Sequence, residues 1–323
     1  MKKYVVILLL SLLGTGFAQD GFPRTIIDGQ GRELTFNAPP ERVLPYYNGS
    51  FGHLATLGIR PVATGANPEM LGDDIYLEDG ETIPRPMVDG TMWDLDFEKV
   101  ASYEPDLIMA FSLDDVDTSG GIAPVYLPSR PSTLGGVQDE LRNVAAIFGV
   151  EARAEEVITT FNDRVAAYAA VIEANADMTV LKLAMVDDGQ FSVATTGDPV
   201  CQMLDIVATC EWQDPTGGSG WGYRTSIEGV LALDPDLIIL NNWADDDPEA
   251  AKAALADDPL WAELSAVQAG KVFSTPGYDN PIASNLPAAQ KVLDTYMARF
   301  FPELFPDGPL TDEQVQEILA ENQ

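Results

Sequence analysis

The sequence predicts an α/β fold of two lobes with mostly parallel sheets, joined by one long rigid α-helix. Three observations lead to this prediction. A helix–turn–strand unit occurs twice, at residues 97–110 and 227–240. A helix-forming stretch without glycine or proline, residues 151–176, lies between the two copies. The chain also has 323 residues, more than one hydrophobic core usually serves.

The two copies of the unit share residues at matching places in the helix, the turn and the strand. The identical pairs are Glu98/Glu228, Val100/Val230, Pro105/Pro235, Asp106/Asp236, Leu107/Leu237 and Ile108/Ile238. Asp96 and Ser226 are suitable N-caps, so each glutamate falls in a first helical turn. The acid-Pro-Asp step ends each helix, because proline disfavours helical geometry before it. The apolar runs 107–110 and 237–240 are typical of strands buried on both faces of a parallel sheet.

The first 18 residues have the form of a secretory signal peptide. Lys2 and Lys3 precede the apolar run 4–13, and small residues precede a cleavage point after Ala18. That run is too short for a membrane span, which needs about 20 residues. No cysteine lies near the cleavage point, which argues against a lipid anchor. We therefore expect a soluble periplasmic protein.

The other expected elements follow in chain order. They are a β-hairpin at 25–36, strands at 42–44 and 61–63, a helix at 51–57, a strand at 125–127, helices at 133–148 and 151–176, a strand at 180–186, a helix at 200–208, a strand at 272–273, a helix at 286–301 and a terminal helix from 311. At 1.5 Å per residue, the central helix would be about 39 Å long, enough to join both lobes. The expected boundaries are 19–149 for the N-terminal lobe, 150–177 for the joining helix and 178–323 for the C-terminal lobe.

Composition excludes several classes of function. The chain has 18 Lys and Arg against 51 Asp and Glu, a formal charge of -33, which disfavours nucleic acids and anionic membranes as partners. It has a single histidine, and no Walker loop, HExxH motif or complete GxGxxG motif. We therefore expect neither an enzyme, nor an intrinsic cofactor, nor a site for a bare metal ion, although Tyr and Asp oxygens could still bind ferric iron directly.

The only two cysteines are Cys201 and Cys210. An oxidising compartment favours a disulfide between them. In one continuous helix they would lie about 13 Å apart, too far to bond. A bridge therefore requires the helix that contains Cys201 to end before Cys210.

The order and spacing of these segments resemble the helical-backbone (class III) periplasmic binding proteins, which serve ABC importers of ferric siderophores, haem and cobalamin. The resemblance covers nearly all of the chain after the signal. It rests on both repeated units, the central helix and the segments 40–44, 57–62, 261–273 and 293–305. It implies two Rossmann-like lobes with a ligand held in the cleft between them. It also implies that Glu98 and Glu228 dock on arginines of the membrane permease, one glutamate from each lobe.

Candidate ligand residues follow the predicted strands or precede the repeated helices, where the ligands of open α/β folds bind. They are Tyr46, Tyr47, Trp93, Arg130, Trp221, Tyr223, Arg224, Trp243 and Tyr278. Any one of these aromatic residues could instead pack in a core. Arg130 and Arg224 could hold carboxylate, hydroxamate or catecholate oxygens, or could form surface ion pairs.

The sequence thus predicts a monomeric binding protein that delivers an Fe(III) chelate, a ferric siderophore, to an ABC permease. Haem or cobalamin is the alternative cargo in the same fold. A chelatase-like enzyme is a further alternative, but the related cobalt chelatases use histidines, and here His53 is alone.

Overall fold

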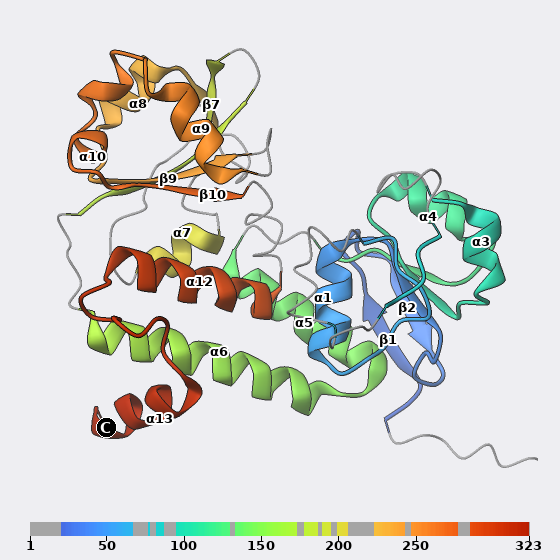
Figure 1. The fold of residues 1–323 in the computed structure, drawn as a ribbon. Helices are drawn as coiled ribbons and strands as arrows, with labels where there is room; N and C mark the ends of the chain where they lie inside the picture. The colour runs from blue at the N-terminus through green and yellow to red at the C-terminus, as the bar shows by residue number, and fades with distance from the viewer. Residues whose placement is uncertain are drawn as a thin grey trace, which may run out of the picture.

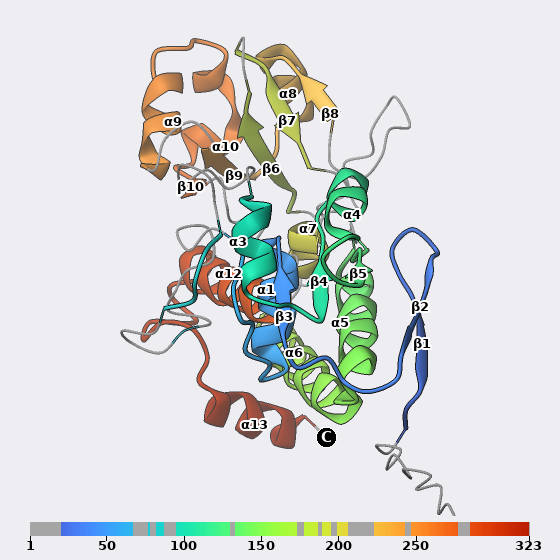
Figure 2. The ribbon, with the colours of Figure 1, turned by 90° about the vertical axis from the view of Figure 1, so that its right-hand side faces the viewer.

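The structure is a computed structural model that describes residues 21–66, 77, 82–86, 95–129, 133–172, 178–186, 189–194, 199–205, 223–242, 247–276 and 285–322. Two α/β lobes lie side by side above a long helix, α6 (Figures 1 and 2). Among the helices of the described residues, none combines the length and apolar character that a bilayer crossing requires.

Within the described residues, the N-terminal lobe has a sheet of three parallel strands in the order β3-β4-β5. Its strands are β3 (Val43–Pro45), β4 (Leu107–Met109) and β5 (Val125–Tyr126), and its helices are α1 (Asn48–Thr56), α3 (Phe97–Ser102), α4 (Leu113–Ser119) and α5 (Leu134–Phe148). The predicted hairpin is present as β1 (Arg24–Ile27) and β2 (Glu33–Phe36). The strand predicted at 61–63 is wrong. Only the Val62 amide bonds to Val43, and Pro61 has no amide hydrogen with which to extend a ladder.

In the parts of the C-terminal lobe that the structure describes, five strands pair in the order β10-β9-β6-β7-β8. They are β6 (Val180–Met185), β7 (Phe191–Val193), β8 (Tyr223–Thr225), β9 (Leu237–Asn242) and β10 (Val272–Pro276). The helices are α7 (Pro199–Leu204), α8 (Ile227–Leu233), α9 (Pro248–Leu255), α10 (Ser265–Gln268), α12 (Leu286–Phe300) and α13 (Asp312–Glu321), with a 3-10 turn η2 (Trp261–Glu263). Strands β6, β9 and β10 are parallel, and β7 pairs antiparallel with both β6 and β8.

The internal repeat extends well beyond the two matching segments. Val43 pairs with Leu107 in the first sheet, and Val180 pairs with Leu237, the equivalent leucine, in the second. On the other side, Ile108 pairs with Val125 as Ile238 pairs with Val272. Strands β3-β4-β5 and β6-β9-β10 are therefore the same three-stranded unit, built twice in the same register.

The shared aspartates explain part of this register. Asp106 accepts hydrogen bonds of 2.8 Å from the amides of Glu41 and Arg42, just before β3. Asp236 accepts a 2.8 Å bond from the amide of Thr179, just before β6, and a 3.0 Å bond from its hydroxyl. Each aspartate thus ties the start of the neighbouring strand to its own strand.

One apolar core is shared by the two lobes. Its buried members include Val43, Leu107 and Tyr126 from the first sheet, Val180, Leu237 and Ile239 from the second, and side chains of α1, α5, α6, α7, α12 and α13. Each sheet has a separate outer core on its other face, which contains Val100 of α3 in the N-terminal lobe and Val230 of α8 in the C-terminal lobe. In β9, Ile238 and Leu240 belong to the outer core, so alternate residues serve opposite faces, as expected for strands covered on both sides.

The joining helix is shorter than predicted. Helix α6 (Glu151–Val171) has 21 residues, about 32 Å at 1.5 Å per residue. It begins after Gly149, which ends α5 in the left-handed conformation at φ 74°. Ile172 is extended and only 3% exposed, so burying this side chain in the shared core takes precedence over helix propensity. Residues 173–177, the rest of the predicted helix, lie outside the described residues.

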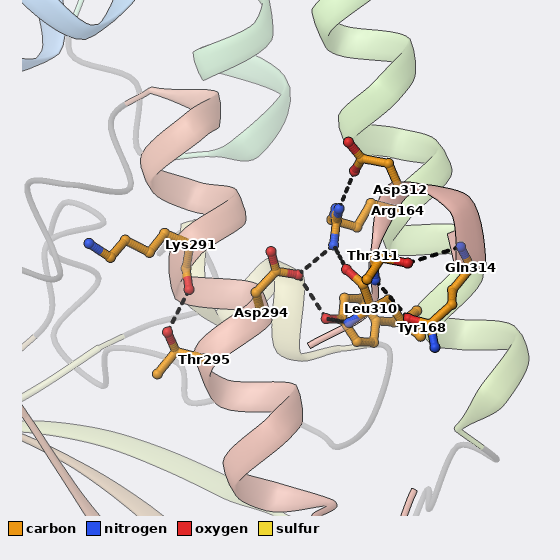
Figure 3. A network of polar contacts seen from close by, with 9 residues as sticks. All are labelled: Arg164, Tyr168, Lys291, Asp294, Thr295, Leu310, Thr311, Asp312 and Gln314. Carbon is orange, nitrogen blue, oxygen red and sulfur yellow. Dashed lines mark hydrogen bonds and ion pairs between the residues drawn. The ribbon is translucent and has the colours of Figure 1, made fainter. Parts of the chain in front are cut away.

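A polar cluster, the Arg164 clasp, fastens α12 and α13 to α6 (Figure 3). The Arg164 guanidinium contacts Asp294 of α12 at 3.0 Å, Asp312 of α13, and the carbonyl oxygen of Leu310. The Tyr168 hydroxyl donates to Asp294 at 2.7 Å and accepts from the Leu310 amide at 3.1 Å. The C-terminal helices are thus bonded to the helix that joins the lobes.

Candidate functional site

Helices that follow the parallel strands contact one another where the two lobes touch. The amide of Leu134, which opens α5 after β5, donates to the side chain of Gln202 on α7 at 2.7 Å. A Cβ on Gly52 of α1 would lie 2.4 Å from the side-chain nitrogen of Asn285, the N-cap of α12. Because α5 follows β5, α1 follows β3 and α12 follows β10 in the chain, these contacts lie between helices that follow strands of the two sheets. Ligands of open α/β sheets bind at the carboxyl ends of the strands.

The first wall of this site carries an aromatic pair. Tyr47 follows β3 and Phe111 follows β4, and their ring centroids are 4.9 Å apart. Both residues are half-buried. Phe111 was not among the predicted site residues, although it directly follows the first repeated strand, which was the available signal. The pair offers a ring surface at the ends of two adjacent strands.

Tyr46 lies differently from Tyr47. It is 5% exposed within the outer core, and its hydroxyl shares a 2.8 Å hydrogen bond with the Ser119 hydroxyl. Burial raises the pKa of Tyr46 to about 12, so the phenol stays protonated. This placement favours the packing role that the sequence left open for each aromatic residue.

The turn after β4 is held by Asp115. Its carboxylate accepts from the Ser112 amide at 2.8 Å, the Ser112 hydroxyl at 2.9 Å and the Phe111 amide at 3.2 Å. This capping box satisfies free amides at the start of α4. It also fixes the backbone that carries the Phe111 ring.

The loop after β5 is held by a second buried acid. Glu140 of α5 is 1% exposed and accepts from the Tyr126 hydroxyl at 2.8 Å. It also accepts from the Ser129 amide at 3.1 Å and from the Ser129 hydroxyl. Burial raises the pKa of Glu140. The chain is therefore fixed up to Ser129, the residue before Arg130.

The second wall is a row of side chains across the C-terminal sheet. Strand pairing aligns Thr275, Asn241, Ala184, Ser192 and Arg224, one from each strand. Paired residues point to the same face of the sheet, and this row lies on the face opposite the outer core. Asn241 is 2% exposed and donates to the Thr275 hydroxyl, whereas Arg224 is exposed. The row thus combines polar groups with a small central alanine.

Asn241 and Thr275 were not among the residues predicted for the site. The Asn-Asn pair that follows a buried apolar run was the available signal in the sequence.

Tyr223 precedes Arg224 on β8 and belongs to the opposite face. It is half-buried against the outer core of the C-terminal lobe. This position, like that of Tyr46, favours packing. Five further predicted ligand residues lie outside the described residues: Trp93, Arg130, Trp221, Trp243 and Tyr278.

Glu98 and Glu228 occupy equivalent positions on the two outer faces. Each is exposed in the first turn of a helix that covers the outer core of its lobe. Asp96 caps α3 by accepting from the Glu98 and Lys99 amides, both at 3.1 Å. A hydrogen bond from Ser226 lowers the pKa of Glu228, which keeps this carboxylate ionised. Both glutamates are therefore accessible to a partner.

Cys201 is 1% exposed on α7 and is disulfide-bonded. Helix α7 ends at Leu204, which meets the geometric condition for a bridge to Cys210. Cys210 itself lies outside the described residues. Nor do the described residues include a group of three or more His, Cys, Asp and Glu side chains able to hold a metal ion.

Comparison with known proteins places this arrangement in a family. The model of the periplasmic binding protein family matches residues 46–278. The chain belongs to this family. YhfQ of Bacillus subtilis (strain 168), described as a putative ABC transporter substrate-binding lipoprotein, is 26% identical over 269 residues, 79% of this chain and 82% of that protein. The iron(3+)-hydroxamate-binding protein FhuD of the same strain is 24% identical over 242 residues, 72% of this chain and 73% of that protein.

The fold itself has solved counterparts. The crystal structure of holo-ViuP matches with a TM-score of 0.69 at 19% identity, covering 92% of this chain and 98% of that one. The predicted fold of two α/β lobes joined by a helix is therefore confirmed. The chain is a substrate-binding protein of an ABC transporter, a component that works with a permease and outside the cytoplasm. Its relatives are binding proteins, which favours binding over catalysis. The expected signal peptide lies outside the described residues.

Proposed function

We propose that this protein captures a ferric siderophore between its lobes and delivers the intact chelate to an ABC permease. The observation that carries the proposal is the pair of unlike walls at the strand ends. One wall offers the Tyr47–Phe111 ring surface, and the other offers the polar row that ends at Arg224. A chelate presents both apolar or aromatic parts and oxygen-rich, partly anionic parts, which suit these two walls. The name of the relative FhuD supports an iron chelate as cargo.

The proposed site includes Arg130 and the predicted aromatic residues outside the described region. Arg130 follows Ser129, which Glu140 binds, and Arg224 belongs to the opposite lobe. Two guanidinium groups could hold carboxylate, hydroxamate or catecholate oxygens by charge-assisted hydrogen bonds. The iron arrives inside the chelate, so the protein needs no cofactor or metal ligands of its own.

Fluorescence titration tests the cargo. The purified mature protein is titrated with a ferric hydroxamate, a ferric catecholate, ferric citrate, haem and cobalamin, and quenching of tryptophan fluorescence is followed. We expect saturable quenching with one ferric siderophore class. A Soret shift and saturable binding with haem alone would assign the protein to the haem alternative. No saturable quenching by any compound would refute the siderophore proposal.

We further propose that Glu98 and Glu228 dock on arginines of the permease. The two carboxylates stand on equivalent helices, one per lobe, on the faces opposite the shared core. A carboxylate in a first helical turn is also stabilised by the helix dipole, by about 0.3–1 kcal/mol, so position alone does not prove docking. The duplication of the exposed acid in both lobes favours docking.

Transport assays separate the two roles. Glu98→Ala and Glu228→Ala should each lower uptake and ATPase stimulation in a reconstituted transporter, and the double variant should abolish both. Chelate affinity should stay within twofold of wild type. Glu155→Ala is the control, because Glu155 is an exposed acid on α6 paired with Arg142. Normal uptake by the double variant would contradict docking through these residues. We also expect a monomer, checked by light scattering.

A further inference from the structure

The inner face of the C-terminal sheet, which carries Ile239 into the shared core, is covered at one level and open at the next. On β6 the side chains of Lys182 and Ala184 both point to this face, because Leu181 and Leu183 belong to the outer core. Lys182 is 3% exposed, whereas Ala184, two residues further along the strand, is half-buried. The cover of this face therefore ends between the two residues, a distance of about 7 Å along the strand.

Helix α7 covers the level of Lys182. The Ala194 amide donates to the Lys182 carbonyl at 3.0 Å, so these two residues lie side by side on adjacent strands. Ala194 is 8% exposed and packs against Cys201 of α7. Figures 1 and 2 show α7 between this sheet and α6. The exposure of Ala184 shows that the helix does not close over the next level.

The open level is the polar row, and exposure rises along it. Thr275 and Asn241 are 1% and 2% exposed. Ala184 and Ser192 are half-buried, and Arg224 is exposed. The row crosses β6, β9 and β10 near their carboxyl ends, where open α/β sheets bind their ligands. The open part of a probable binding surface thus begins at Ala184.

The alanine itself is unusual for its place. Alanine is depleted in strands, and the neighbouring residues that pack on either face of β6 are larger, such as Leu183 and Lys182. Strand propensity and core packing therefore do not explain a methyl group here. A small side chain between Asn241 and Ser192 leaves room in front of the sheet, with polar groups on both sides.

We propose that Ala184 is a specificity-determining residue of the ligand site. Its methyl group is the floor on which the oxygen-rich part of the chelate lies, and its small size sets how large a chelate the site accepts. The Ser192 hydroxyl and the Arg224 guanidinium, on the open side of this floor, can donate hydrogen bonds to the chelate oxygens. This inference rests on the proposed function, since it takes a chelate as the ligand.

A size series at position 184 tests the floor. Ala184→Ser, Ala184→Val and Ala184→Leu are titrated with a ferric trihydroxamate and a ferric tricatecholate, and urea unfolding checks that each variant is folded. For the chelate that wild type binds, we expect the serine variant to stay within about threefold and the leucine variant to bind about tenfold more weakly or worse, with valine between them. If the leucine variant does not fold, the valine variant supplies the comparison. Ala254→Leu makes the same change at an exposed position of α9 and should bind as wild type. Unchanged affinity in the folded Ala184 variants would overturn the proposal.

Thiol labelling tests the open level without any ligand. Cys201 is disulfide-bonded, so an introduced cysteine is the group expected to react with a small methanethiosulfonate reagent. Ala184→Cys should react within about tenfold of the rate of the exposed Ala254→Cys. It should react about 100-fold faster than Ala167→Cys, because Ala167 is 0% exposed in the shared core. A saturating ferric chelate should slow labelling of Ala184→Cys about tenfold and leave Ala254→Cys unchanged.

The two proposals fail in different ways. Absence of saturable binding by wild type to every chelate would refute the proposed function, and the specificity role of Ala184 with it. Saturable binding by wild type, combined with an Ala184→Cys that reacts as slowly as Ala167→Cys, would overturn the open floor alone. Saturable binding without protection of Ala184→Cys by the chelate would do the same, and the proposed function would stand.

Discussion

Replacing Arg164 by methionine should destabilise the protein far more than the same change at Arg142. The Arg164 side chain is 5% exposed, and its partner Asp294 is 18% exposed. Removing one member of a buried ion pair costs about 3–5 kcal/mol, because the other charge is left buried. The bond from Tyr168 still supports Asp294, and Asp312 is 86% exposed, so its contact adds little. We therefore expect a loss of about 3 kcal/mol from Arg164→Met.

Arg142 supplies the matched control. It pairs with Glu155 and Asp139, but its side chain is 40% exposed. Exposed pairs contribute about 0.2–1 kcal/mol, so Arg142→Met should cost less than 1 kcal/mol. Urea titration at pH 7.5 measures the loss of unfolding free energy in both variants. The slopes m are compared first, because equal slopes show that both variants expose similar surface on unfolding. Losses of similar size for the two variants would refute the argument that burial sets the energy of the Arg164 clasp.

The pH dependence of this loss provides a second check. Burial raises the pKa of Asp294 in the folded protein, so between the unfolded and folded pKa values the folded state binds more protons. Ionisation of Asp294 thus opposes folding, and this penalty disappears as pH falls. In Arg164→Met the carboxylate has lost its cation, so the penalty is larger. The difference in free energy of unfolding between Arg164→Met and wild type should therefore become smaller from pH 7.5 towards pH 4. A difference that does not change with pH would contradict this account.

Three further predictions follow from buried or duplicated groups. Burial lowers the pKa of His53 to about 4, so wild type should lose about 3 kcal/mol of stability as pH falls from 6.5 to 4. Denaturant titrations should show a smaller loss of stability in His53→Leu over the same pH range. Equal losses in the two proteins would count against a buried neutral histidine. Asp106→Ala and Asp236→Ala should each cost about 1–3 kcal/mol in urea unfolding, because each frees donors at a strand start, and an effect in only one lobe would contradict their equivalence. Tyr46→Phe should cost about 1 kcal/mol of stability and leave the chelate affinity unchanged, because the Tyr46 hydroxyl bonds to Ser119 in the outer core. Tyr47→Ala should weaken chelate binding at least threefold in the quenching titration. A larger loss of chelate affinity in Tyr46→Phe than in Tyr47→Ala would place the ligand against Tyr46.

The fold was predictable because strand burial and helix ends are local signals. The alternation Leu237–Leu240 and the proline at each repeated turn lie in short segments, and the structure follows them. The end of α6 was not predictable, because the burial of Ile172 depends on side chains that are distant in sequence.

The candidate site was only partly predictable, for the same reason. Position at a strand end made Tyr46 and Tyr47 equally good candidates for contact with the ligand. The side chains of adjacent residues point to opposite sides, however, and only the contact with Ser119 shows that Tyr46 is the buried one. Likewise, no sequence signal connects Glu140 with Ser129, because their contact depends on how α5 packs beside β5.

The apolar interior that passes beneath both sheets has a consequence for how this molecule could have been assembled and how it can be divided. A duplication would explain two equal sheet units, yet neither half now carries a complete interior of its own. A cut between residues 149 and 150 would leave each fragment with uncovered leucine, valine and tyrosine side chains from this region. The two halves therefore depend on each other, because each keeps apolar side chains of the other out of water.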